Sequence, residues 1–188
     1  MEKDREKWNK KYTSDEPHPE EPSEILKQFY TLAKKGKALD IAAGLGRNSI
    51  FLAEQGFKVD AVDISDVAIE HLKKLKNPNI KPILADLDYY TIPENEYDLI
   101  VNINFLNRRL FPQIKEGLKE GGVLIFETFL LDKNTHIKTK DYLLRKNELL
   151  QSFIDMRVVF YQERETTKIT GEKASVASLV AVKECKLV

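Results

Sequence analysis

The feature that most constrains the fold of this chain is a repeated alternation of short apolar runs with amphipathic stretches. The apolar runs are nearly continuous, as in strands buried on both faces of a parallel sheet, and they cover Ala38–Ile41, Val59–Val62, Ile80–Leu84, Leu99–Ile103 and Val123–Phe129. The intervening stretches have helical spacing with start or stop signals, and they cover Asn48–Gln55, Val67–Leu75 after a candidate N-cap Ser65, and Arg109–Lys119. This order predicts an open parallel sheet with helices on both faces and right-handed connections.

The last part of the chain departs from this alternation. A short helix is predicted over Asn147–Phe153, followed by two apolar runs, Arg157–Gln162 and Ser175–Val182, with a hairpin-type connection between them. An α/β sheet that finishes with two strands and no helix between them needs an antiparallel final strand. The turn-rich link from Leu84 to Leu99 shows little helical period, so it is predicted to be a loop.

The chain of 188 residues is predicted to form one domain over residues 23–188. Residues 1–22 are highly charged and then proline-rich, and we interpret them as an N-terminal cap or tail. A helix is expected from Ser23, with apolar residues at helical spacing up to a stop at Gly36.

Charge and cysteine content restrict the partners and the compartment. Thirty Lys and Arg balance thirty Asp and Glu, which argues against a generic nucleic-acid binder. The single Cys185 cannot form an intramolecular disulfide, and no apolar run approaches the ~18 residues of a membrane span. The start also lacks the apolar stretch of a secretory signal. We therefore expect a cytoplasmic monomer or homodimer with no membrane or nucleic-acid partner.

The most informative segment runs from Asp40 through Ala42, Gly44 and Gly46 into the next helix. Small residues let a ligand approach the backbone, and free N–H groups at the start of the helix face that ligand. In doubly wound sheets, ligands lie beyond the carboxyl ends of the strands where the strand order reverses. The loop is predicted to lie at such a place.

Polar residues follow the next strands at the same edge. Asp63, nineteen residues after Gly44, ends the second strand, where a carboxylate can accept hydrogen bonds from both ribose hydroxyls. Asp86 follows the third strand, and Asn102 and Asn104 follow the fourth. Taken singly, these features also have structural explanations. A Gly-x-Gly motif is a common turn, Asp63 could cap a helix and Asp86 could lie on the surface. Their coincidence at strand ends predicts a nucleoside-containing ligand.

The loop also indicates which nucleoside is bound. Ser49 stands where a nicotinamide or flavin fingerprint has its third glycine, and Gly46 is followed by Arg47-Asn48 rather than by the Lys-Ser or Lys-Thr of a phosphate loop. The acid Asp40 would repel a pyrophosphate but suits a ligand with an ammonium group. These features disfavour a nicotinamide-dependent oxidoreductase.

With the motif Asp40-x-Ala42-x-Gly44-x-Gly46, the chain resembles the class I S-adenosylmethionine-dependent methyltransferases, with Ala42 where that family usually has glycine. The segments GRNSIFLAEQGFKVDAVDIS and RRLFPQIKEGLKEGGVLIFETF, with the opening W-N-x-x-Y, look like its tellurite-resistance branch. The resemblance implies an α/β, Rossmann-like, seven-stranded, mostly parallel sheet whose last strand is antiparallel.

The resemblance also implies a cofactor, S-adenosylmethionine, with S-adenosylhomocysteine as product. Asp40, Ala42, Gly44 and Gly46 would line its methionine part, and Asp63 would hold the ribose. The remaining implied contacts are Ile64 on the adenine, Asp86 and Leu87 at the adenine edge, and Asn102 beside the amino-acid end. The reaction would be an in-line attack on an already activated methyl group, for which positioning and exclusion of water matter more than a strong base.

The residues that contact the acceptor are less defined. Arg47, Arg108 and Arg109 flank the predicted cleft and could bind a metalloid oxyanion, while a thiol-like nucleophile is the other acceptor considered. Tyr142 and Phe105, with Trp8 and Tyr12, could form an aromatic lid, although core packing is the commoner role for such residues. The catalytic candidates are therefore Arg47, Arg108, Arg109 and Tyr142. The three isolated histidines, His18, His71 and His136, suggest no zinc site and are interpreted as structural or solvated.

Alternative functions remain open at this point. A non-catalytic sensor or subunit that binds S-adenosylmethionine would keep the same pocket residues. A macromolecular substrate is disfavoured because no recognition domain or strongly basic face is evident. The Asn/Asp-Pro-Pro-Tyr motif of many amino-methylating nucleic-acid enzymes is also absent, since Asn102-Ile103-Asn104-Phe105 stands in its place.

Overall fold

The computed structural model describes residues 2–14, 18–131 and 142–184. Its helices are α1 (Glu2–Thr13), α2 (Glu24–Phe29), the 3-10 turn η1 (Tyr30–Leu32), α3 (Arg47–Glu54), α4 (Asp66–Lys74), α5 (Leu110–Gly117) and α6 (Glu148–Ser152). Its strands are β1 (Lys37–Ile41), β2 (Lys58–Asp63), β3 (Ile80–Leu84), β4 (Tyr97–Ile103), β5 (Leu118–Phe129), β6 (Arg157–Thr167) and β7 (Lys173–Val182).

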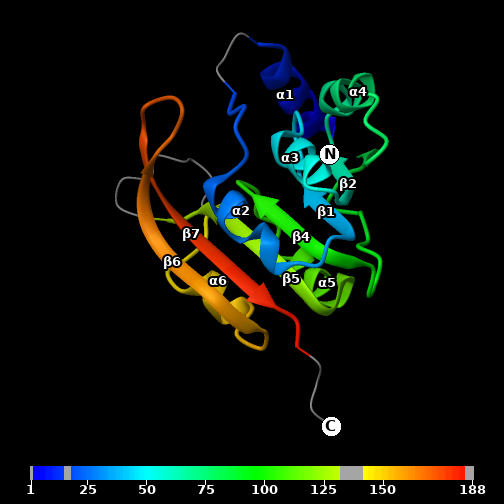
Figure 1. Cartoon of the computed structure of the whole chain (residues 1–188). Helices are drawn as coiled ribbons and strands as arrows, with labels where there is room; N and C mark the ends of the chain where they lie inside the picture. Colours follow the sequence, from blue (N-terminus) through cyan, green and yellow to red (C-terminus); the bar gives the residue numbers. More distant parts are fainter. Residues whose placement is uncertain (1, 15–17, 132–141, 185–188) are drawn as a thin grey trace.

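The strands form one sheet in the order β3-β2-β1-β4-β5-β7-β6 (Figure 1). The first five strands are mutually parallel, and β7 runs antiparallel to both β5 and β6. The predicted seven-stranded, mostly parallel fold with an antiparallel last strand is therefore confirmed. The order reverses between β1 and β4, so the glycine loop after β1 lies at the switch point, as expected.

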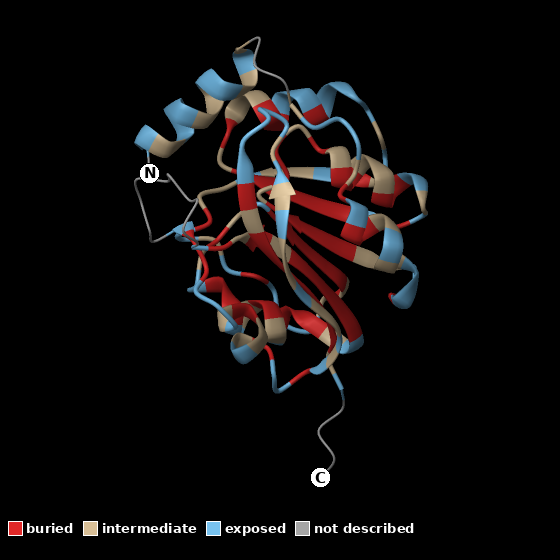
Figure 2. Cartoon of the chain, turned by 90° about the vertical axis from the view of Figure 1, so that its left-hand side faces the viewer, coloured by how far each residue is buried: buried red, intermediate tan, exposed pale blue. Residues whose placement is uncertain are grey.

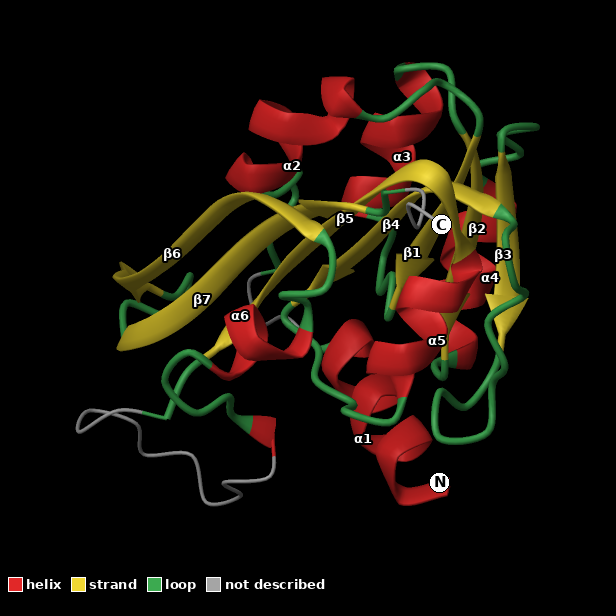
Figure 3. Cartoon of the chain, turned by 90° about the horizontal axis from the view of Figure 1, so that it is seen from below, coloured by secondary structure: helices red, strands yellow, loops and turns green. Residues whose placement is uncertain are grey.

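Two layers of helices cover the sheet (Figure 3). On one face, α2, α3 and α4 contribute apolar residues such as Leu26, Leu52 and Leu72 to a core cluster. On the other, α5 and α6 contribute Ile114 and Leu149 to a second cluster. Figure 2 shows that the buried residues gather in the strands while the outer helix surfaces are exposed. Burial on both faces explains why the parallel strands are nearly continuously apolar.

Several predicted boundaries are wrong for identifiable reasons. The helix predicted over Arg109–Lys119 stops at Gly117, because Leu118 already pairs with Tyr97 as part of β5. β6 continues to Thr167 and β7 begins at Lys173, since the polar residues between the two predicted strands pair as an extended hairpin. The predicted loop between β3 and β4 and the N-cap at Ser65, whose Oγ accepts from the Ala68 N–H at 3.2 Å, are confirmed.

The helix predicted from Ser23 to Gly36 is shorter than expected, since α2 ends at Phe29 and gives way to η1. The charged N-terminal segment contains α1, which lies beside α4 at the end of the molecule opposite the C-terminus (Figure 1). Asn9 ties the two helices together, because its side chain accepts from the Ser65 Oγ at 2.6 Å and donates to Asp66 at 3.2 Å. The division at residue 22 between cap and domain stays a prediction.

No helix within the described residues is long and apolar enough to cross a membrane. Within the same residues, no group of three or more His, Cys, Asp or Glu side chains is arranged to hold a metal ion. His71 is exposed on α4, as predicted. His136 and Cys185 lie outside the described residues.

Candidate functional site

The loop after β1 has a backbone that few side chains tolerate. Gly44 and Gly46 adopt positive φ angles of 56° and 87°. A Cβ placed on Gly44 would lie 2.8 Å from the Tyr12 hydroxyl oxygen, so this position is a cradle that holds the Tyr12 hydroxyl and that only glycine permits. Ala42, the departure from the expected glycine, also has a positive φ of 55°, a conformation that costs an L-residue roughly 1–2 kcal/mol.

Asp40 is a buried acid at the carboxyl end of β1, with 1% of its surface exposed. Its Oδ2 accepts a hydrogen bond of 2.6 Å from the Ser49 hydroxyl. Burial raises the pKa of Asp40 to about 7, although the Ser49 hydrogen bond and the Arg47 charge oppose this rise. Ser49, which breaks the dinucleotide fingerprint, therefore has a role the sequence analysis missed, namely to hold this acid. The signal was a polar residue at a buried helix position.

Asp63 lies beside the same loop and is also buried, with 4% of its surface exposed. Its Oδ2 accepts from the Gly44 N–H at 2.8 Å, and its Oδ1 accepts from the Ser65 N–H at 2.9 Å. Burial raises the pKa of Asp63, while hydrogen bonds from backbone N–H groups lower it. The carboxylate therefore fixes the glycine loop against the start of α4.

Tyr12 of α1 covers this loop. Its hydroxyl lies over Gly44, and burial together with the nearby charges of Asp63 and Asp40 raises its pKa, so the phenol keeps its proton. Its ring stacks on Trp8 with a centroid distance of 5.7 Å, and it also contacts the His18 ring. The His18 Nε2 is buried and has no hydrogen-bond partner in the described structure. Tyr12 thus covers the glycine loop with Trp8 stacked on its ring, and their role as an aromatic lid stays a prediction.

The other predicted cofactor residues lie at the ends of β2, β3 and β4. Ile64 is half-buried after β2, and Leu87 is buried in the turn after β3. Asp86 caps that turn by accepting the Asp88 N–H at 2.9 Å. Asn102 is buried and donates to the Phe105 carbonyl at 2.7 Å, which holds the turn after β4. Their cofactor roles stay predictions.

The four catalytic candidates do not form one cluster. Arg47, at the start of α3, donates to the Glu21 carbonyl at 2.8 Å, and it is electrostatically coupled to Asp40 and Glu127. Arg108 pairs with Glu148, while Arg109 donates to the Leu87 and Tyr90 carbonyls at 2.8 and 2.7 Å. These two guanidinium groups tie loops together beside α5. Tyr142 is 56% exposed, and Phe105 packs against the core.

A further polar group at the carboxyl edge was missed in the sequence. Glu127, near the end of β5, accepts hydrogen bonds from the Ser178 hydroxyl at 2.5 Å and from Arg164 at 3.0 Å. The available signal was one acid inside the otherwise apolar run LIFETF. Its partners could not be found because they belong to β6 and β7, which the sequence does not place beside β5.

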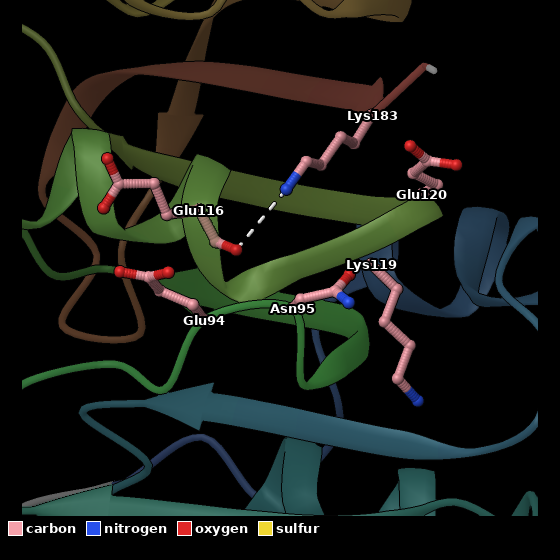
Figure 4. A pocket seen from close by; sticks show the side chains of 6 residues that line it. All are labelled: Glu94, Asn95, Glu116, Lys119, Glu120 and Lys183. Atoms are coloured by element: carbon pink, nitrogen blue, oxygen red, sulfur yellow. Dashed lines mark hydrogen bonds between the residues drawn. The ribbon is translucent and has the colours of Figure 1, made fainter. Parts of the chain in front are cut away.

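A surface hollow of about 580 Å³ lies at the opposite, amino edge of the sheet (Figure 4). It is lined by Glu94, Asn95, Glu116, Lys119, Glu120 and Lys183. Lys183 donates to the Leu118 carbonyl at 2.6 Å, and Lys119 pairs with Asp98 at 2.8 Å, so these ammonium groups hold the start of β5 in place. The candidate site is therefore the carboxyl edge and not this hollow.

A family model and a curated relative of this chain carry the same family name. A family model described as "Tellurite resistance protein TehB" matches residues 1–171. The "Probable S-adenosyl-L-methionine-dependent methyltransferase TehB" of Haemophilus influenzae (strain ATCC 51907) is 33% identical over 138 residues, which are 68% of this chain and 48% of that protein. This chain thus spans about half the length of the curated relative.

Solved structures agree with the fold. The crystal structure of TehB from Haemophilus influenzae superposes with a TM-score of 0.74 and 25% identity, covering 96% of this chain and 67% of that one. A phosphoethanolamine N-methyltransferase of Haemonchus contortus, in complex with S-adenosylhomocysteine, superposes with a TM-score of 0.68. At 18% identity, covering 86% of this chain and 52% of that one, the second likeness concerns the fold alone.

Proposed function

Because the chain belongs to the TehB family, we propose that it transfers a methyl group from S-adenosylmethionine to a small-molecule acceptor. The observation that carries this proposal is the glycine loop at the sheet's switch point, with positive φ at Gly44 and Gly46, flanked by two buried carboxylates, Asp40 and Asp63. The name of the Haemophilus influenzae relative, which includes dependence on S-adenosyl-L-methionine, supports it.

The residues at the carboxyl edge fit this cofactor. The absence of a side chain at Gly44 lets the Tyr12 hydroxyl, or a ligand in its place, approach the backbone, and the buried carboxylate of Asp40 suits an ammonium group. Asp63 has both oxygens directed by backbone N–H groups, and each carboxylate oxygen can accept a further bond from a ribose hydroxyl. Asn102 would lie beside the amino-acid end, with Ile64, Asp86 and Leu87 around the adenine.

The protein's own contribution to the reaction is positioning. S-adenosylmethionine supplies an activated methyl group when bound, so the chain needs to align the acceptor and keep water away. Tyr12, protonated and packed over the loop, closes one side of the site. Arg47, on which the charges of Asp40 and Glu127 both act, is the catalytic candidate at this edge that can orient an anionic acceptor such as a metalloid oxyanion.

Calorimetric titration with S-adenosylmethionine, S-adenosylhomocysteine and NAD tests the proposal. We expect the wild type to bind the first two and not NAD. Asp63→Ala should weaken that binding at least about tenfold, because a hydrogen bond to a charged group is worth roughly 1.5–3 kcal/mol. The matched control is Asp155→Ala, which removes an exposed carboxylate paired with Lys115.

The two possible failures have different meanings. If neither sulfur compound binds the wild type, the proposed function is wrong. If they bind the wild type and Asp63→Ala equally well, only the assigned ribose contact is wrong. A thermal melt of each variant separates lost binding from lost folding.

A further inference from the structure

Ser49 is a fully buried polar residue on the side of α3 that faces the sheet. None of its surface is exposed, and its hydroxyl donates to the Asp40 Oδ2 at 2.6 Å. Asp40 is itself only 1% exposed. Burial of a carboxylate is costly unless donors stabilise its charge. The Ser49 hydroxyl therefore offsets part of the cost of keeping Asp40 ionised inside the fold.

The carboxylate of Asp40 also caps α3 from a neighbouring strand. The helix begins at Arg47, and Gly46 before it supplies no side-chain cap. Ser49 is the third residue of the helix, so its backbone N–H has no partner inside the helix. Hydrogen bonds from both its hydroxyl and its backbone N–H lower the pKa of Asp40, which burial raises. Ser49 thus offers two donors to the ionised form of this acid.

Titratable groups from three elements lie around Asp40. Against the rise in pKa caused by burial, the charge of Arg47 in α3 favours the ionised form, while Asp63 at the end of β2 disfavours it. Tyr12 of α1 keeps its proton, because burial and the charges of both acids raise its pKa. The Tyr12 hydroxyl lies over Gly44 and still feels the charge of Asp40. An ammonium group bound against the same loop would feel that charge as well.

We propose that Ser49 is a positioning residue for the cofactor, because its hydroxyl keeps Asp40 ionised and oriented toward the ammonium group of S-adenosylmethionine. This inference rests on the proposed function and deepens it. Ser49 acts through Asp40 and does not touch the cofactor. Its hydroxyl therefore strengthens the binding of ligands that carry the ammonium group, and the gain depends on pH.

Two ligands separate this role from a purely structural one. S-adenosylhomocysteine carries the ammonium group, whereas 5′-methylthioadenosine has the same adenosine and sulfur but lacks the amino-acid end. Calorimetry between pH 6 and 8 gives the affinity for the first ligand, and displacement of the first by the second gives the other affinity. The readout is the ratio of the two affinities. A partial loss of folded protein lowers both affinities alike, so it leaves the ratio unchanged.

Ser49→Ala removes the hydroxyl and keeps the backbone N–H. The pKa of Asp40 should rise further, because its ionised form loses one hydrogen bond. A hydrogen bond to a charged group corresponds to at least about a tenfold change in an equilibrium. The affinity ratio should therefore fall by about tenfold at pH 6.5, and the loss should shrink toward pH 8, where Asp40 ionises in both proteins.

Two further variants complete the test. In an Asp40→Asn background, Ser49→Ala should leave the ratio unchanged, because the group through which Ser49 acts is gone. Tyr97→Phe is the matched control, since Tyr97 also uses a buried hydroxyl to donate to a buried aspartate, Asp60, at 2.9 Å. Its ratio and pH profile should equal those of the wild type, even if the free energy of unfolding falls.

An unchanged ratio in Ser49→Ala, or a loss that is equal at every pH, overturns the inference. The same loss in the Asp40→Asn background or in Tyr97→Phe also overturns it. All these outcomes leave the proposed function standing, because the wild type still binds S-adenosylhomocysteine. If the wild type does not bind that compound, the proposed function fails and this inference fails with it.

Discussion

The two edges of the sheet both carry buried acids, but these acids have different partners. At the amino edge, Asp60 pairs with the Lys37 ammonium at 3.0 Å and accepts from the Tyr97 hydroxyl at 2.9 Å. At the carboxyl edge, Asp40 and Asp63 accept from a hydroxyl and from backbone N–H groups. An acid paired with a lysine is neutralised within the fold. An acid held mainly by neutral donors has no salt-bridge partner within the fold, so a cationic group of a ligand can still pair with it, and the partner distinguishes a site from a brace.

The sharpest test of this contrast compares two glycines with positive φ, one at each edge. Gly44→Ala adds a methyl group into the cradle under Tyr12, whereas Gly121 at the amino edge has nothing within 4 Å of an added Cβ. Both substitutions should cost roughly 1–2 kcal/mol in backbone strain. We expect only Gly44→Ala to weaken S-adenosylmethionine binding, by about 100-fold, because overpacking costs up to ~3 kcal/mol.

Calorimetric affinities and denaturation curves of both variants check this prediction. Equal affinities in the two variants would show that the cradle is not where the cofactor lies. A large affinity loss in Gly121→Ala would contradict the separation of the two edges.

The second test disrupts the amino edge. Asp60→Ala removes the carboxylate acceptor of the Tyr97 hydroxyl, which is on a fully buried side chain, and removes one partner of Lys37. The free energy of unfolding should fall by about 2 kcal/mol, with S-adenosylmethionine affinity unchanged. Glu96→Gln, which alters the more exposed partner of Lys37, should cost less than about 1 kcal/mol. Urea denaturation with parallel calorimetry measures both effects, and reduced affinity in Asp60→Ala would argue against a purely structural amino edge.

The third test uses pH. Burial raises the pKa of Asp40 to about 7, so the native state binds a proton that the unfolded state releases near its ordinary value of 3.8. The contribution of this group to the free energy of unfolding is therefore fully present below about pH 4 and declines as the pH rises to about 7. Asp40→Asn should remove that decline. The difference in unfolding free energy between the variant and the wild type should therefore be smaller at low pH than at pH 7.

Ligand binding should show the opposite dependence. If ionised Asp40 pairs with an ammonium group, affinity for S-adenosylmethionine falls up to about tenfold per unit below pH 7. Titrations between pH 5.5 and 8 test this. A wild-type affinity that does not vary with pH, or an Asp40→Asn variant with the same profile, would separate Asp40 from the ammonium group.

Local sequence patterns predicted most of the fold because each parallel strand is buried on both faces and each crossover helix has its own signals. Ser65, for example, was recognised as an N-cap from its position alone, and the structure shows its bond to Ala68. Boundaries failed where tertiary pairing overrides local pattern. Leu118 reads as helical by spacing, yet it pairs with Tyr97 in the sheet.

The candidate site was also predictable from the sequence only where its residues directly follow strands. The loop at Gly44 and the acid Asp63 follow strands directly, so their proximity could be inferred from strand order. Glu127 and Ser178 could not be placed, since they pair across strands that are distant in sequence. Arg108 and Arg109 were plausible as anion ligands by residue type, but residue type does not reveal that their guanidinium groups hold loops together.

The position of β7 has a consequence for how the protein assembles during synthesis. β7 is the last of the described strands along the chain, yet it lies between β5 and β6. While the ribosome is still adding residues 173–182, β6 has no neighbour in the described sheet to pair with, and Ser178 has not yet reached Glu127. A nascent chain can therefore complete the half of the described sheet with the glycine loop well before the half with β6 and β7.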